Sequence, residues 1–165
     1  MRRRFLPLAA VLALVPAGAW GQASASANLT VQATVIKALT LQKVSAGNLD
    51  FGLVAQGTTE TIAASSSGAI QFRANGEPSG SVSVTYANVT LTNGTNTMTF
   101  TPAVIGHNTN TQGSASTVAS GGTVTLDATT GDFYFWVGGS ITASATQATG
   151  AYSGTFTLSV AYTGV

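Results

Sequence analysis

The chain has 165 residues and a mass of 16.5 kDa, the size of one ordinary domain. Only 7% of the residues are charged and none is cysteine, whereas 19 are glycine, 26 are threonine and 16 are serine. This composition excludes a helical bundle, a coiled coil and a nucleic-acid-binding protein, and it is typical of a secreted all-β protein.

Residues 1–21 have the organisation of a cleaved secretory signal peptide. Three arginines at positions 2–4 precede an apolar run from Phe5 to Val15, and small residues follow at the spacing that signal peptidase reads. The apolar run covers about 11 residues, whereas a membrane-spanning helix needs about 20. We therefore expect cleavage somewhere in residues 19–25. The mature protein would be secreted, and it would cross the periplasm on its way to the cell surface or the extracellular space.

Removal of this leader reverses the sign of the net charge. Three basic side chains remain against five acidic ones, which gives −2 in place of the +1 of the whole chain. No basic patch is left that could neutralise phosphates or anionic lipids. We therefore expect no nucleic-acid partner and no membrane insertion after cleavage.

The first segment of the expected mature chain, residues 22–35, contains a complete alternation of apolar and polar side chains. The apolar positions, which form a candidate assembly strand, are Ala27, Leu29, Val31, Ala33 and Val35. A period of two predicts an amphipathic β-strand. Two interpretations remain open: the segment pairs within its own domain as an edge strand, or it is donated to another subunit.

Shorter alternations predict ten further strands at residues 39–43, 50–54, 60–63, 69–73, 81–86, 89–92, 98–104, 123–126, 132–137 and 140–143. Asn75-Gly76 and Asn93-Gly94 predict type I′ hairpins, and Gly121-Gly122 and Gly138-Gly139 predict further tight turns. Residues 106–122 are polar and predict a long exposed loop. A closing strand is expected to bury one face, consisting of Phe156, Leu158, Val160 and Tyr162.

Short strands at this spacing predict an immunoglobulin-like β-sandwich of mostly antiparallel strands, formed by a single domain over residues 22–165. A membrane barrel would need strands of about 9–11 residues and two girdles of aromatic side chains. Most of the strands expected here are shorter, and the aromatic residues cluster at positions 133–136.

No arrangement of side chains in the sequence predicts catalysis or a metal site. His107 is the only histidine and lies in the polar segment, where a solvated loop residue is expected. Asp127 and Asp132 bracket a polar turn but lack the ligand spacing of a calcium loop. We therefore expect no enzyme activity and no cofactor. Tyr134 and Trp136 are candidate glycan contacts, because alternate rings of one strand form a flat platform; burial of that strand is the alternative.

Several segments, taken in order, resemble a secreted bacterial family known as domain of unknown function 4402. The matching pieces are residues 33–41, 49–52 (Leu-Asp-Phe-Gly), 76–78 (Gly-Glu-Pro), 135–141 and 150–162. More distantly, the Asp-Phe-Gly tripeptide and the closing Gly-x-Tyr strand are similar to fimbrial and spore-coat-type subunits. The resemblance to these subunits implies assembly by a chaperone and an usher. Many such subunits carry one disulfide, which this cysteine-free chain cannot form.

Together these features predict a structural subunit of a bacterial surface filament or coat, assembled by β-strand donation. Its expected partners are further copies of itself and a periplasmic chaperone and usher. The alternative is a monomeric secreted carbohydrate-binding or adhesive module that uses Tyr134 and Trp136.

Overall fold

The computed structural model describes residues 25–164, so the expected signal peptide lies outside the described residues. The described part divides after Thr34 into a short N-terminal segment and a domain that begins at Val35. Over residues 25–164 the structure is all-β, with strands β1 to β10 and a single short 3-10 turn, η1, at Gln112–Ser114. No helix in this part of the chain is long and apolar enough to cross a membrane.

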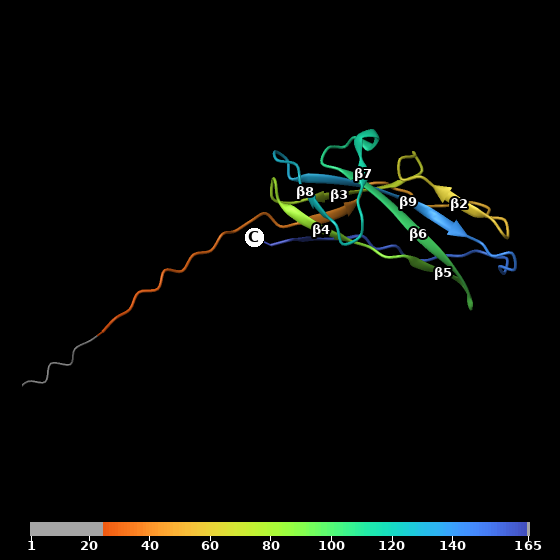
Figure 1. Cartoon of the computed structure of the whole chain (residues 1–165), viewed down its shortest axis with the longest axis horizontal. Helices are drawn as coiled ribbons and strands as arrows, with labels where there is room; N and C mark the ends of the chain where they lie inside the picture. Colours follow the sequence, from red (N-terminus) through yellow and green to blue (C-terminus); the bar gives the residue numbers. More distant parts are fainter. Residues whose placement is uncertain (1–24, 165) are drawn as a thin grey trace, which may run out of the picture. The chain divides into compact units, whose positions relative to one another are not determined.

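The larger sheet of the domain is strongly curled and entirely antiparallel (Figure 1). Its main path runs in the order β1 (Thr40–Lys43), β3 (Ile70–Asn75), β9 (Asp132–Thr142), β6 (Asn96–His107) and β5 (Val89–Asn93). Two short strands extend it: β2 (Thr59–Ile62) pairs with β9, and β7 (Ser116–Thr117) pairs with β6.

The smaller sheet contains β10 (Ser159–Tyr162), β4 (Ser81–Thr85) and β8 (Thr123–Thr125), in that order. The main core cluster lies between this sheet and the larger one, and its largest fully buried side chains are Phe135, Leu126, Val82, Val84 and Val104. Period-two alternation places these apolar side chains on the inward face of their strands, which confirms the expectation of an all-β, antiparallel protein.

The expected turn at Gly138-Gly139 is wrong, because β9 continues through both glycines. Gly138 is required by close packing: a Cβ atom there would overlap the backbone of residues 62–64. Gly139 has a φ of 149° and lies against the carbonyl oxygen of Thr101 and the ring of Phe100. These two glycines therefore do not form a turn. They lie within a strand and allow other chain segments to approach its backbone closely.

Substitution of Gly138 by alanine is expected to destabilise the domain by about 1–3 kcal/mol, because the backbone that the new methyl group meets cannot move like a flexible side chain. Gly47→Ala is the matched control, since a Cβ atom at Gly47 has no neighbour within 4 Å. Urea unfolding of both variants checks this expectation. Equal losses at the two positions would contradict the packing assigned to Gly138.

The two predicted type I′ hairpins also need correction. At Asn93-Gly94 a hairpin does form, but Asn93 pairs with Asn96, so Gly94 and Thr95 are the central residues. Only Gly94 has a positive φ (59°), whereas type I′ needs positive values at both positions. Asn75-Gly76 forms no hairpin, because β3 leads into β4 of the other sheet. The polar segment 106–122 contains η1 and β7 and is therefore only partly a loop.

Two predicted strands are absent from the described structure. Residues 27–35 and 50–54 have no strand assignment, although both carry the expected alternation of side chains. A strand needs a partner for its backbone N–H and C=O groups, and alternation alone does not supply one.

Candidate functional site

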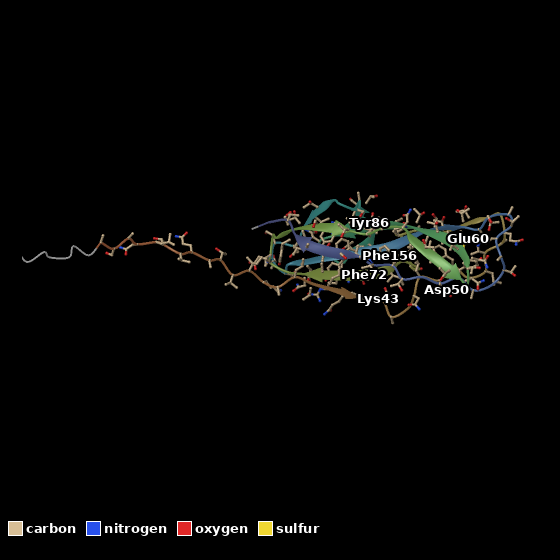
Figure 2. All side chains as sticks on the ribbon, turned by 90° about the horizontal axis from the view of Figure 1, so that it is seen from below. Lys43, Asp50, Glu60, Phe72, Tyr86 and Phe156 are labelled. Carbon is tan, nitrogen blue, oxygen red and sulfur yellow. The ribbon has the colours of Figure 1, made fainter. Side chains whose placement is uncertain are left out.

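An open groove of about 920 Å³ lies on one side of the domain. Its floor is the concave face of the curled sheet, with Ile70, Phe72, Val89, Leu91, Met98, Phe100, Val137 and Ile141. One wall is formed by residues 48–56 and the other by residues 147–156. In Figure 2, Phe72 and Phe156 lie at the middle of the domain, and Lys43 and Asp50 lie along its lower side.

Most of the floor belongs to a second hydrophobic cluster, whereas Phe72 and Val137 belong to the main core cluster. The buried members of the second cluster are Met98, Phe100, Ile141 and Ala143, and the wall residues Leu49, Phe51, Val54 and Tyr152 are only partly buried against it. The rings of Phe51 and Phe156 meet Phe100 edge-on at centroid distances of 5.9 and 6.1 Å. This cluster is a core that is left open on one side.

Most of the first wall, together with the two residues before it, leaves its backbone polar groups available. Within residues 25–164, no backbone–backbone hydrogen bond links residues 46–54 to another segment; the Gly52 N–H donates only to the side chain of Asp50, at 2.9 Å. Leu53, in this wall, is completely exposed. The wall thus combines apolar side chains with unpaired N–H and C=O groups, which a neighbouring strand could satisfy.

The second wall has the same property over a shorter stretch. Ser153 exchanges two backbone hydrogen bonds with Thr92 of β5, at 2.9 and 3.1 Å, and β10 pairs with β4 further along. Between these contacts, residues 154–158 make no backbone–backbone hydrogen bond with any other described residue. β1 and β10 are in addition edge strands of their sheets. Both sides of the groove therefore include stretches of backbone that make no backbone–backbone hydrogen bond with another described segment.

The candidate assembly strand, residues 27–35, is exposed and unpaired in the described structure. Leu29 is 86% exposed, Val31 is 82% exposed and Val35 is 95% exposed. Ala27 and Ala33 are exposed as well. Exposure of large apolar side chains at every second position is unfavourable in water, so this segment favours a partner that covers one of its faces.

The predicted core strand packs as one face. Leu158 is buried, and Phe156, Val160 and Tyr162 are half-buried against the main core cluster, whereas Thr155, Thr157, Ser159 and Ala161 are exposed. Phe156, at the end of the second wall, also packs against the second hydrophobic cluster, so this residue connects the two clusters.

Tyr134 and Trp136 do lie together on one face of β9, but they do not form an open platform. Their rings stack at a centroid distance of 6.4 Å, and Trp136 is only 5% exposed. Gln112, in the turn η1, donates hydrogen bonds to the carbonyl oxygens of Ala64 and Ser66, which joins two loops. A buried indole has little free surface to offer a sugar ring, so Trp136 corresponds to the alternative of a buried strand.

Asp132 is the buried charged residue of the domain and lies beside Tyr134. Its carboxylate accepts two hydrogen bonds from Arg73, both at 2.9 Å, and one from Asn75 at 2.6 Å. Burial opposes ionisation of Asp132, but the hydrogen bonds from Asn75 and Arg73 and the charge of Arg73 outweigh it. The pKa of Asp132 therefore lies below its ordinary value.

A lowered pKa makes stability depend on pH in a defined direction. Because the folded-state pKa of Asp132 lies below the unfolded value of about 3.9, its contribution is complete above that value and disappears as the pH falls through the folded-state pKa. Asp132→Asn is expected to cost about 1–3 kcal/mol at pH 7 and much less in strong acid. Urea unfolding at both pH values measures this, with the exposed Glu60→Gln as control. A loss that stays constant with pH would contradict the assigned role.

The remaining candidate residues do not come together as a reactive site. His107 ends β6 rather than lying within a loop, and its Nδ1 atom lies 2.8 Å from the hydroxyl group of Thr109. Asp127 accepts hydrogen bonds from the backbone of Thr130 and Thr129, which lower its pKa, and it orders the turn before β9. Within residues 25–164, no three His, Cys, Asp or Glu side chains are placed to hold a metal ion.

Sequence reasoning did not identify the groove, although it identified the residues of one wall. Residues 50–54 alternate in sequence but form no strand: Phe51 and Val54 pack against the second cluster, Leu53 is fully exposed, and Gly52 has a positive φ of 64°. An apolar alternation without a partner was the available signal. It could not be recognised without knowing which strands pair.

Comparison with known proteins gives a family and no activity. No curated protein matches the sequence. The model of the family described as a domain of unknown function (DUF4402) matches residues 29–162, which span most of the chain and include both the groove and the greater part of the exposed segment. The chain therefore belongs to the family of domain of unknown function 4402.

Proposed function

We propose that this protein is a structural subunit of a bacterial surface filament or coat, in which residues 27–35 of one copy fill the groove of another. These residues are called the arm below. A single observation carries the proposal: one chain contains both an open apolar groove with unpaired walls and an exposed, unpaired segment of alternating apolar residues. An open apolar groove and an exposed apolar segment are each unfavourable in water. The arm would cover the apolar floor of the groove, and the groove would offer backbone partners to the arm.

The chemistry of the arm suits the groove. Residues 22–36 carry no charge, and an extended strand from Ala27 to Val35 would cover about 26 Å. Its five apolar side chains would lie against the floor, while its backbone could pair with residues 46–54 and 154–158. Addition of this strand would join the two sheets across the gap, and we propose that the completed domain is an immunoglobulin-like β-sandwich.

An unfilled groove is an aggregation hazard before assembly. Open apolar floors and unpaired edges associate non-specifically when chains are transiently exposed. This supports the proposal that a periplasmic chaperone covers the groove after signal cleavage, and that an usher exchanges the chaperone for the arm of the next copy. The resemblance to fimbrial and spore-coat-type subunits supports the same partners.

The alternative of a monomeric carbohydrate-binding or adhesive module gains no support from the candidate residues, because Trp136 is only 5% exposed. A catalytic role likewise gains no support from the scattered carboxylates. The structural role is therefore the proposal that the groove and the arm favour.

Electron microscopy of producing cells tests the proposal. We expect filaments or a coat on cells that carry the gene, their loss on deletion of the gene, and their return on complementation. Immunogold labelling with antibody to this chain should decorate the structures. Identical cell surfaces with and without the gene, together with monomeric protein in the medium, would contradict a structural role.

A further inference from the structure

The arm of a chain could in principle fill the groove of the same chain, and the structure contains a feature that opposes this. The arm leads into β1, which begins at Thr40, so only residues 36–39 separate the two segments. For an arm to run back beside its own β1, the chain must reverse direction within these residues. Whether it can do so decides between a self-closed monomer and a polymer.

The chain between the arm and β1 has poor turn chemistry. Residues 34–39 read Thr-Val-Ile-Lys-Ala-Leu and include no Gly, Pro, Asn, Asp or Ser, the residues that supply turn conformations. Val35 and Ile36 are β-branched and favour extended backbone. Leu39 is packed against the main core cluster, which fixes the end of the segment.

A closed ring of three hydrogen bonds holds the backbone at Lys37. The Lys37 N–H donates to the carboxylate of Glu77 at 2.8 Å, the Glu77 N–H donates to the hydroxyl oxygen of Tyr162 at 2.6 Å, and that hydroxyl group donates to the Lys37 carbonyl oxygen at 2.8 Å. Lys37 and Glu77 are 40 positions apart in the sequence, Glu77 and Tyr162 are 85 apart, and Lys37 and Tyr162 are 125 apart. We call this arrangement the Lys37 ring.

The Lys37 ring occupies both backbone polar groups of the residue at which a reversal would have to occur. The Lys37 ring requires glycine at position 76. A Cβ atom there would overlap the hydroxyl group of Tyr162 and crowd Leu39. A tight turn at residues 35–39 would reorient the Lys37 peptide and break these bonds.

We propose that the Lys37 ring, together with the turn-poor segment 34–39, commits the arm to the groove of a second copy by preventing its return to its own groove. Glu77 and Tyr162 are therefore positioning residues for assembly. This inference rests on the proposed function, since it assumes that the arm fills a groove, but it concerns which copy provides it.

Cross-linking of introduced cysteines tests the inference, because the natural chain has no cysteine. The reporter is the mature full-length chain with Thr30→Cys in the arm and Leu53→Cys in the first wall, both exposed positions. A short bis-maleimide joins the two cysteines, and denaturing gels separate covalent ladders, which form between copies, from monomers joined internally. In the otherwise unaltered reporter we expect ladders.

Loss of the ring should convert ladders into internally joined monomers. In Glu77→Ala/Tyr162→Phe we expect the internally joined fraction to rise about tenfold at micromolar protein, because a tethered arm has an effective concentration in the millimolar range. Glu77→Gln retains an acceptor oxygen for the Lys37 N–H and should keep the ladders. Ile36→Asn/Lys37→Gly supplies turn residues without changing the arm, Glu77 or Tyr162, and it should also produce internally joined monomers.

The outcomes separate the inference from the proposed function. Unchanged ladders in the folded ring variant and in the turn variant would overturn the inference and leave strand donation intact. Internally joined monomers in the unaltered reporter would overturn both, as would the absence of arm-to-wall cross-links in every background. If circular dichroism shows that Glu77→Ala/Tyr162→Phe is unfolded, the Ile36→Asn/Lys37→Gly variant decides.

Discussion

Val31→Asp is expected to abolish assembly of the mature protein while leaving its domain folded. Val31 is 82% exposed in the described structure, so the substitution removes no packing from the domain itself. In the groove, however, the carboxylate would face an apolar floor without a partner, at a cost of several kcal/mol. A cost of about 3–4 kcal/mol weakens association about 100- to 1,000-fold. Size-exclusion chromatography with light scattering measures the change.

Thr30→Asp is the matched control for this substitution, because it introduces the same charge one residue away on the opposite face of the strand. We expect Thr30→Asp to assemble almost as well as the unaltered protein. Equal loss of assembly in both variants would show that the arm tolerates no charge on either face, and it would contradict insertion with a defined face. Normal assembly of Val31→Asp would contradict insertion altogether.

Leu158→Ala is expected to destabilise the domain by about 2–5 kcal/mol, the second large effect. Leu158 is buried among the main core cluster, and truncation leaves a cavity between the two sheets. Thr157→Ala, at the exposed neighbouring position, should cost well under half of that. The free energy of unfolding in urea gives both values.

This pair of substitutions tests the register of the closing strand. A slip of one residue would exchange its two faces, and Thr157 would then be the buried position. Comparable losses at Leu158 and Thr157 would contradict the register. A larger loss at Thr157 would reverse it.

The all-β class could be predicted from the sequence because strand alternation is local. Phe156, Leu158, Val160 and Tyr162 share one face wherever the strand lies, since successive side chains point to opposite sides. The same local rule identified the strands at residues 81–86 and 89–92 to within one residue at each end.

Features that depend on other chain segments could not be predicted in this way. Gly138-Gly139 resembles a turn in sequence, yet both glycines serve close approach by distant segments, and only the pairing of β9 with β2 and β6 reveals this. Trp136 alternates as an outward-facing residue should, yet its side chain is buried in the folded domain. The period of a strand predicts its faces and leaves open what lies against each face.

The candidate site combines one predictable half and one unpredictable half. The alternation from Ala27 to Val35 predicts that the arm forms an amphipathic strand when it is paired. Leu29 and Val31 are exposed in the described structure, so their apolar face is still uncovered. The groove arises from the absence of pairing between residues 46–54 and 154–158, which are about a hundred residues apart in sequence. An absent partner leaves no local pattern in a sequence.

Hydrogen–deuterium exchange, followed by mass spectrometry on assembled and dissociated mature protein, tests strand donation most directly. Assembly should protect the backbone amides of three segments together: the arm at residues 27–35 and two segments beside the groove, residues 46–54 and 154–158, which make no backbone–backbone hydrogen bond with another described segment. Val31→Asp should show none of this protection. Polymers whose protection lies elsewhere, with the arm and both walls still exchanging freely, would contradict the account.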